Sequence, residues 1–237
     1  MLFPANAPKW YAHHTATLVE RKGSESMATV TELNNPLVLD RITRLRDQTT
    51  SSREFRQFVK EVTILLAAEA TNDLTVTEVE VQTPLQVTTG QLISQPGPCI
   101  VSIMRAGNIM AETLRDLISD ASIGFIGLAR QPVTLEIDDY YTNLPNDVRD
   151  RYCIVVDPML ATGNSLSVAL RKLIETGVDQ ITVVNILACP EGIQRITSEY
   201  PDIKIVVAKV DDRLNDKGYI LPGLGDAGDR IYGTDDH

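Results

Sequence analysis

Histidine is nearly absent from this chain, and so is the chemistry that depends on it. Three of the 237 residues are histidines, and all of them, His13, His14 and His237, lie near a terminus. Histidine is the general base of catalytic triads and the commonest side-chain ligand of transition metals. We therefore exclude a histidine-based triad and a histidine metal centre from the body of the protein.

Basic residues are also in the minority. The sequence holds 22 lysines and arginines against 32 aspartates and glutamates, a formal net charge of -10 at pH 7. Proteins that bind nucleic acid neutralise its phosphates with a basic face, so this balance argues against a nucleic-acid partner. A polyanionic substrate would require local arginines or a metal ion to offset the general repulsion.

Cysteines and long apolar runs are few. Cys99, Cys153 and Cys189 lie far apart in or beside apolar segments, and their number and spacing fit neither a disulfide framework nor a zinc site. Reduced, buried thiols of this kind are typical of a cytoplasmic protein. The apolar runs, such as residues 153–156, have the length of strands, so we expect no membrane-spanning segment.

The chain divides into an N-terminal extension and one domain. Residues 1–30 show no steady hydrophobic period and no apolar run followed by a cleavage site, which predicts a flexible extension rather than a secretory signal. Residues 31–237 are long enough to bury one sizeable core. Regular structure within them is expected to begin near Asn35.

Two helices and a hairpin are expected before residue 98. The spacing of apolar residues predicts helices over 36–47 and 51–70, and Ser51 with Glu54 forms a capping box for the second. Further on, alternating apolar and polar residues predict a half-buried strand, and Gly90 is expected to turn the chain back into a β-arm.

From residue 98, apolar strands alternate with amphipathic helices. Strands are predicted at 99–104, 123–128, 152–156, 181–188 and 203–207, and helices at 109–118, 166–175 and 191–199. This order is typical of an α/β fold whose mostly parallel sheet is covered on both faces. Residues 131–150 have no core pattern, and so long a loop is usually functional, which predicts a lid there.

The most informative segment joins a buried strand to a helix. The strand ends at Asp157, small residues follow, and a helix is expected to start at Ser165. Free helix amides and the hydroxyls of Thr162 and Ser165 suit a phosphate, whereas Asp157 suits ribose hydroxyls or a magnesium ion. The combination indicates a site for a ribose 5-phosphate. A plain strand-to-helix turn would explain Ser165 as an N-cap, but not the acid together with Ala-Thr-Gly.

Two other phosphate-binding motifs are excluded. No Gly-Lys-Ser/Thr follows Gly163, so the loop is not a Walker A motif. Residues 223–228 match the dinucleotide fingerprint letter for letter, but Pro222 precedes them and only nine residues follow, too few to complete a βαβ unit. These glycines do allow a tight loop whose backbone approaches a planar ligand such as a pyrimidine edge.

Three segments together carry a resemblance to a known family. Residues 155–165, the motif Met104-Arg105-Ala106-Gly107, and the run Asn-Asp-Lys-Gly-Tyr-Ile-Leu-Pro-Gly-Leu-Gly-Asp-Ala-Gly-Asp-Arg at 215–230 resemble uracil phosphoribosyltransferase, over roughly residues 35–234. The C-terminal run is the most specific. The resemblance implies a type I phosphoribosyltransferase core with a small hood over the base. It also implies the conversion of uracil and phosphoribosyl pyrophosphate (PRPP) to UMP and pyrophosphate in pyrimidine salvage.

The resemblance assigns roles by position. Arg105 and Arg130 would contact the pyrophosphate of PRPP and act in catalysis, and Asp226 would face the donor and help to remove the N1 proton of uracil. The PRPP site would also include nine consecutive residues: Asp157, Pro158, Met159, Leu160, Ala161, Thr162, Gly163, Asn164 and Ser165. The uracil slot would consist of Ile220, Gly225, Asp226 and Ala227.

The resemblance also implies a cofactor and partners. Magnesium would be the cofactor, and Asp157 would interact with it indirectly. The family and the β-arm suggest a homo-oligomer, a dimer or a tetramer. Whether GTP acts as an allosteric effector, as it does in some relatives, is left open by the sequence.

Three positions depart from the family pattern. Asn108 stands where a leucine is usual, Gln131-Pro132 replaces an acidic pair, and Asn164 replaces a second glycine. A polar side chain is thus expected in a packed position at Asn108, and a left-handed backbone at Asn164. An alternative hypothesis is therefore a divergent, catalytically weak homologue that binds nucleotides and regulates a partner. An RNA-binding regulator on the same fold is disfavoured by the net charge, and the intact Arg105 and Arg130 favour the enzyme.

Overall fold

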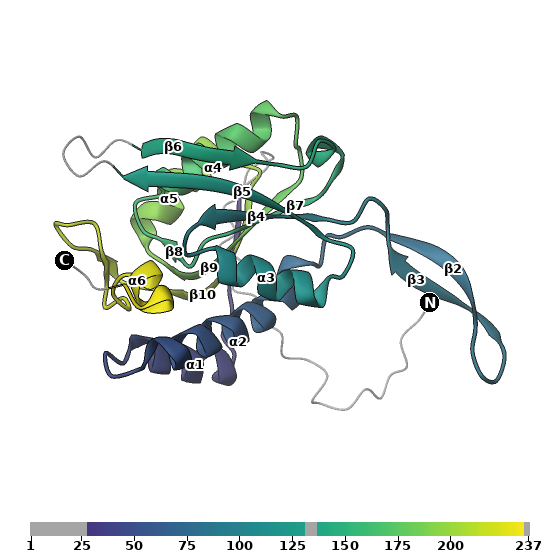
Figure 1. Ribbon diagram of the computed structural model, residues 1–237, viewed down its shortest axis with the longest axis horizontal. Helices are drawn as coiled ribbons and strands as arrows, with labels where there is room; N and C mark the ends of the chain where they lie inside the picture. The colour runs from purple at the N-terminus through teal and green to yellow at the C-terminus, as the bar shows by residue number, and fades with distance from the viewer. Residues whose placement is uncertain (1–27, 131–136, 235–237) are drawn as a thin grey trace, which may run out of the picture.

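The core of the protein is an eight-stranded sheet. The computed structural model describes residues 28–130 and 137–234, and its strands run in the order β1-β10-β9-β7-β4-β5-β6, with β8 paired to β9 (Figure 1). All pairings are parallel except that of β6 with β5. The strands are β1 Thr29–Glu32, β4 Cys99–Met104, β5 Ser122–Arg130, β6 Ile137–Asn143, β7 Cys153–Val156, β8 Met159–Leu160, β9 Ile181–Ala188 and β10 Lys204–Val210. The predicted mostly parallel α/β sheet is confirmed.

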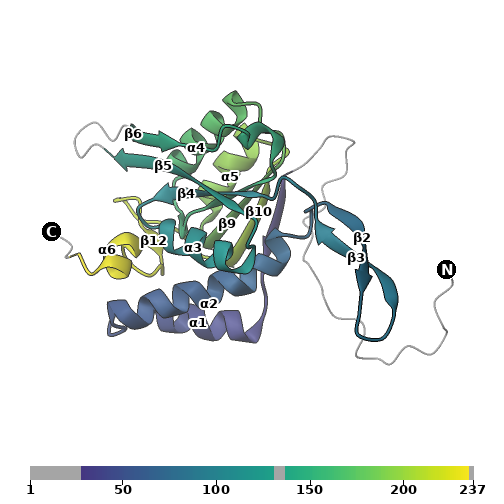
Figure 2. The ribbon, with the colours of Figure 1, turned by 45° about the vertical axis from the view of Figure 1, so that its right-hand side comes forward.

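Helices cover both faces of this sheet (Figures 1 and 2). They are α1 Pro36–Arg46, α2 Ser52–Ala70, α3 Asn108–Leu117, α4 Asn164–Glu175, α5 Pro190–Glu199 and α6 Ala227–Tyr232, with a 3-10 turn at Val148–Asp150. One core layer contains side chains of α1, α2, α3 and α6, and the other contains those of α4 and α5. Along β10, Val206 faces the first layer and Ile205 and Val207 the second, so strands buried on both faces are apolar throughout. No helix in the described part of the chain is long and apolar enough to cross a membrane.

The second helix begins as the sequence predicts. The Ser51 hydroxyl accepts a hydrogen bond from the amide of Glu54 at 3.3 Å, and the Glu54 carboxylate accepts one from the amide of Ser51 at 3.2 Å. This reciprocal capping box satisfies two amides that the helix cannot pair internally.

The sequence does not reveal strand β1. Its residues pair in parallel with β10, from Thr29 with Lys204 to Glu32 with Val207, so regular structure begins before Asn35. The strand is short and alternates polar with apolar residues, too few for a periodic signal. Of the extension predicted at residues 1–30, residues 1–27 lie outside the described part of the chain.

Part of the expected lid is an edge strand. Within 131–150, residues Ile137–Asn143 form β6 at the sheet edge and pair antiparallel with β5, while 131–136 lie outside the described residues. Asp139 forms an ion pair with Lys172 of α4, which ties this edge to the layer behind it. Tyr140 is 54% exposed, and an edge strand with side chains so exposed carries no core pattern that sequence analysis could detect.

The β-arm is present, but Gly90 does not turn it. β2 (Val76–Gln82) pairs antiparallel with β3 (Val87–Ile93), and Gly90 lies within β3 opposite Val79. The turn lies at 83–86, where the hydroxyl of Thr83 accepts hydrogen bonds from the amides of Leu85 and Gln86 at 3.2 and 3.0 Å. The arm projects from the body of the protein (Figures 1 and 2).

A C-terminal hood returns to the carboxyl edge of the sheet. It comprises the strand pair β11 (Arg213–Leu214) and β12 (Ile220–Leu221), followed by the loop that leads into α6. The buried carboxylate of Asp211 accepts hydrogen bonds from Arg46 of α1 at 2.8 Å and from the amide of Gly223 at 2.9 Å. Arg46 also donates to the carbonyl of Gly223 at 2.8 Å. The hood is thus fixed to α1 through one ion pair.

Loss of this arginine should destabilise the fold. In Arg46→Met the carboxylate of Asp211, whose side chain is 2% exposed, would lack its cation, and we expect a loss of about 3 kcal/mol in the free energy of unfolding. Arg44→Met breaks a pair with Asp40 whose side chains are 54% and 44% exposed, and should cost less than about 0.5 kcal/mol. Urea unfolding of both variants measures the difference, and equal losses would contradict the role given to Asp211.

Candidate active site

Several of the predicted site residues line one open pocket at the carboxyl edge of the sheet. The pocket has a volume of about 200 Å³ and is lined by Ile103, Met104, Arg105, Ala106, Leu128, Asp157, Ser165, Asp226 and Gly228. Strands β4, β5 and β7 end at this edge, where ligands of parallel sheets usually bind. The structure therefore brings Arg105, Asp157, Ser165 and Asp226 together from three separate parts of the sequence.

The loop after β7 turns at Gly163, where φ is +78°. Helix α4 begins at Asn164, so the expectations of a helix start at Ser165 and of a left-handed Asn164 are both wrong. Glycine takes the left-handed conformation without a side-chain clash, which leaves Asn164 free to be the first helical residue. The Asn164 side-chain oxygen accepts a hydrogen bond from Arg195 of α5. This departure from the family pattern therefore does not disturb the turn.

Helix α5 supports the same loop from the adjoining layer. A Cβ atom on Gly192 would lie 2.3 Å from the carbonyl oxygen of Ala161, so only glycine allows this approach. The Cys189 thiol donates to that carbonyl at 3.1 Å. Burial raises the pKa of Cys189 to about 11, so the thiol stays neutral and can donate. All three cysteines are buried and free, as predicted.

Sequence analysis missed Asn185, which positions Asp157. Asn185 is fully buried in β9, and its amide nitrogen donates to the backbone carbonyl of Asp157 at 2.7 Å. The backbone amide of Asp157 in turn donates to the backbone carbonyl of Val184 at 3.2 Å. The available signal was a single polar residue in the otherwise almost wholly apolar strand Ile181–Ala188, because a buried amide side chain requires a partner.

Asp157 carries the most perturbed carboxyl of the pocket. Its pKa is raised from 3.8 to about 7, mainly by burial; a hydrogen bond from the amide of Met159 lowers the pKa, and the nearby charge of Asp226 contributes to the rise. In the described part of the chain, no three His, Cys, Asp or Glu side chains gather into a metal site. Two neighbouring carboxylates do fit a hard cation whose remaining ligands come from a substrate.

The loop after β4 carries Arg105. Gly107 packs this loop onto the end of β7, because a Cβ atom there would lie 2.5 Å from the carbonyl oxygen of Val156. The Arg105 side chain is 58% exposed and pairs with Asp229 of α6 at 3.3 Å. Arg130 ends β5 at the same edge of the sheet, and its side chain lies outside the described residues.

The hood supplies the segment predicted to bind uracil. Ile220 and Ala227 are each 4% exposed and belong to one hydrophobic cluster, against which Met159 and Ala161 of the phosphate loop pack. Gly225 has a φ of +84°. Asp226 caps α6 by accepting a hydrogen bond from the amide of Asp229 at 2.9 Å. The predicted uracil and phosphate segments therefore lie against each other.

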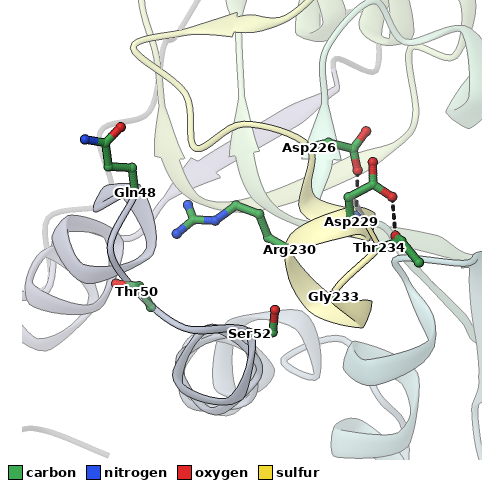
Figure 3. Close-up of a pocket in the computed structure, with 8 residues that line it drawn as sticks. All are labelled: Gln48, Thr50, Ser52, Asp226, Asp229, Arg230, Gly233 and Thr234. Atoms are coloured by element: carbon green, nitrogen blue, oxygen red, sulfur yellow. Dashed lines mark hydrogen bonds between the residues drawn. The ribbon is translucent and has the colours of Figure 1, made fainter. Parts of the chain in front are cut away.

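A second pocket lies between α6 and the segment that joins α1 to α2 (Figure 3). Its volume is about 370 Å³, and it is lined by Gln48, Thr50, Ser52, Asp226, Asp229, Arg230, Gly233 and Thr234. Arg230 donates to the carbonyls of Leu45, Leu224 and Asp47 and lies 4.3 Å from the Phe55 ring centroid. The guanidinium of Arg230 therefore links the hood to the first two helices.

Comparison with known proteins identifies the family. The model of the uracil phosphoribosyltransferase family matches residues 32–234. The chain belongs to the uracil phosphoribosyltransferase family. Uracil phosphoribosyltransferases of Finegoldia magna and Caldanaerobacter subterraneus are 48% and 46% identical to it, over 88% and 85% of this chain and 100% and 96% of theirs.

Two solved structures resemble this fold. A protein of Aquifex aeolicus is 37% identical and superposes with a TM-score of 0.83, covering 88% of this chain and 100% of its own. An adenine phosphoribosyl transferase from Trypanosoma brucei is 13% identical, with a TM-score of 0.52 over 83% of this chain and 88% of its own. The second likeness shows the phosphoribosyltransferase fold alone.

The raised pKa of Asp157 predicts a pH-dependent stability. Because the folded protein holds this proton more tightly than the unfolded chain, the stabilisation is complete below pH 3.8 and is lost as pH rises through about 7. Asp157→Asn cannot ionise, so its free energy of unfolding should rise relative to the parent protein between pH 5 and pH 8. Urea unfolding of both proteins at both pH values measures this. A difference in free energy of unfolding that stays constant between pH 5 and pH 8 would contradict the raised pKa of Asp157.

Proposed function

We propose that this chain transfers the 5-phosphoribosyl group of PRPP to uracil, giving UMP and pyrophosphate in pyrimidine salvage. The observation that carries the proposal is the single pocket to which the Arg105 loop, the Asp157–Ser165 loop and the hood all contribute. A member of the uracil phosphoribosyltransferase family with this arrangement has a place for each part of both substrates.

The 5-phosphate would lie on residues 161–165. The first amides of α4 have no partner within the helix, and the helix dipole favours an anion at this end. The hydroxyls of Thr162 and Ser165 add donors. A net charge of -10 is no obstacle here, because backbone amides provide the local positive potential.

The ribose would lie next to Asp157. Its carboxylate can accept hydrogen bonds from both ribose hydroxyls, and binding them requires the ionised form, which prevails above about pH 7. Magnesium, when bound with the donor, neutralises charge on the pyrophosphate, and Asp157 with Asp226 would face it. A cation there would relieve the repulsion between the two carboxylates.

The leaving pyrophosphate would lie against Arg105 and Arg130. The bond from C1′ to the pyrophosphate oxygen breaks as the bond from C1′ to uracil N1 forms, and N1 loses its proton. Arginine forks match the paired oxygens of the pyrophosphate and stabilise its growing negative charge. The exposed Arg105 side chain is available to a ligand at the cost of one exposed ion pair with Asp229.

Uracil would be bound by the backbone of the hood. Since the side chains of Ile220 and Ala227 are buried, polar contacts to the base would come from backbone groups of Ile220 and of 225–227. Fixed donors and acceptors reject cytosine, because its 4-amino group would leave one of them unpaired. One oxygen of Asp226 caps α6, so the other is the candidate acceptor for the N1 proton.

The relatives give no support to a regulatory homologue, since those named above carry the name of the enzyme. The departure at Asn108 is also accommodated, because its side-chain oxygen accepts a hydrogen bond from the buried Ser102 at 2.7 Å. Gln131-Pro132 lies outside the described residues.

The proposed function is tested by UMP formation from labelled uracil, PRPP and magnesium. We expect turnover in the parent protein, and a fall in kcat/KM of at least about 100-fold in Arg105→Ala, since Arg105 stabilises the leaving group. Arg115→Ala, at the other end of α3, is the matched control and should leave the rate unchanged. Absence of turnover in the folded parent protein that still binds UMP would favour the regulatory alternative. Repeating the assay with GTP tests the expected effector.

We also propose that the β-arm joins two copies of the chain. An isolated two-stranded hairpin is only marginally stable in water. In this arm the apolar residues Leu85, Leu92 and Val87 are 93%, 60% and 52% exposed, and clustered apolar exposure marks an interaction surface. Such apolar exposure is explained by burial against a second copy.

Light scattering of the purified chain tests the arm. We expect the mass of a dimer or tetramer, and a lower mass for Leu92→Asp, because a charge on the arm would be buried without a partner. Leu117→Asp, at a position 51% exposed at the end of α3, should keep the parent mass. A monomeric parent protein, or no change in Leu92→Asp, would contradict the arm as the contact.

A further inference from the structure

A buried polar side chain interrupts strand β4 just before the Arg105 loop. Ser102 is fully buried, and its hydroxyl donates to the side-chain oxygen of Asn108 at 2.7 Å. Asn108 is the first residue of α3, so this bond closes the loop 103–107 between strand and helix. A leucine, usual at position 108 in the family, could not accept it.

Tyr232, the last residue of α6, reaches the same loop from the hood. Its hydroxyl donates to the backbone carbonyl of Arg105 at 2.9 Å, and its ring centroid lies 5.8 Å from the Arg105 guanidinium carbon. Burial raises the pKa of Tyr232, while the charge of Arg105 and hydrogen bonding with Asn108 act in the opposite direction. The hydroxyl therefore stays protonated at neutral pH and can donate.

The contacts between the Arg105 loop and α6 all lie near one end of the pocket. Besides Tyr232, Asp229 pairs with the Arg105 side chain at 3.3 Å. A Cβ atom on Gly228 would lie 3.9 Å from both the Ala106 side chain and the Arg105 guanidinium. Of these three contacts with α6, the Tyr232 bond meets the loop at its backbone, so it holds the loop in place while the Arg105 side chain engages a ligand.

We propose that Tyr232 and Asn108 are positioning residues that hold the Arg105 loop against α6 and thereby set the separation between the pyrophosphate arginine and the uracil-binding hood. This inference rests on the proposed function. The Ser102–Asn108 hydrogen bond joins β4 to the start of α3, and the Tyr232 hydroxyl joins α6 to the Arg105 backbone, so both bonds act on the one loop. Asn108 is then part of the support of the site.

The decisive variant is Tyr232→Phe, which removes the hydroxyl and keeps the ring over Arg105. We expect the KM for PRPP to rise about 10-fold, the value of one lost hydrogen bond in a site, with the KM for uracil changed less than twofold. Asn108→Leu should show the same selective rise. In the double variant the KM for PRPP should rise no more than in the more affected single variant, because both residues act on the position of one loop.

Two controls separate positioning from stability. The hydroxyl of Tyr200, which follows α5, donates to the backbone carbonyl of Ser167 in α4 at 2.9 Å. Tyr200→Phe removes this comparable bond away from the Arg105 loop and should leave the KM for PRPP unchanged. In Asn108→Leu, adding Ser102→Ala removes the unpaired buried hydroxyl. The melting temperature should then recover while the KM for PRPP stays high.

Calorimetric binding of inorganic pyrophosphate keeps the test independent of turnover. Tyr232→Phe should weaken the affinity for pyrophosphate about 10-fold, whereas Tyr200→Phe should leave this affinity unchanged. If the parent protein forms no UMP but Tyr232→Phe still weakens pyrophosphate, the proposed function falls and the positioning role stands. If Tyr232→Phe leaves pyrophosphate affinity and the KM for PRPP unchanged, the positioning role is overturned, whether or not UMP is formed.

Discussion

The return of the hood to the carboxyl edge of the sheet is the constraint on which the site depends. The strands can position Arg105 and Asp157, but the predicted uracil segment follows the last strand and must be brought back to them. The buried carboxylate of Asp211 does this by binding Arg46 of α1 and the amide of Gly223 together. Arg230 adds a second link, to carbonyls of the α1–α2 region. The segment predicted to bind uracil is thus held by the N-terminal helices as well as by the sheet, to which the amide of Asp211 donates at Ala188.

Anion binding by an acidic protein follows from the same architecture. The loop at 161–165 offers backbone amides and hydroxyls, and Arg105 is the exposed cation beside them. Against these stand Asp157 and Asp226; burial, with a smaller contribution from the charge of Asp226, raises the pKa of Asp157 to about 7. The pocket thus holds groups of both signs, and Arg105 and Asp226 both lie beside Gly228. A substrate with an anionic phosphate, neutral hydroxyls and a metal-bound pyrophosphate matches that distribution.

The sequence predicts the central sheet and the pocket better than the edges of the molecule. Strands such as β7 are apolar throughout because both faces are covered, and this pattern can be read from the sequence alone. Strands β1 and β6 are edge strands with few buried side chains, so they carry no such signal. The position of the arm turn at Thr83 depends on a side-chain hydrogen bond rather than on glycine. Asn185, Tyr232 and Arg46 each contact residues that are far away in the sequence. Such contacts cannot be read from the sequence, because they exist only once the chain has folded.

One nucleotide is expected to span the phosphate loop and the hood, and a crystal structure of the protein with UMP tests this arrangement. We predict the 5′-phosphate on the amides of 161–165, the ribose hydroxyls facing Asp157, and the uracil against the backbone of Ile220 and of 225–227. Binding of UMP in the pocket of Gln48, Thr50 and Ser52, with residues 161–165 bare, would contradict it.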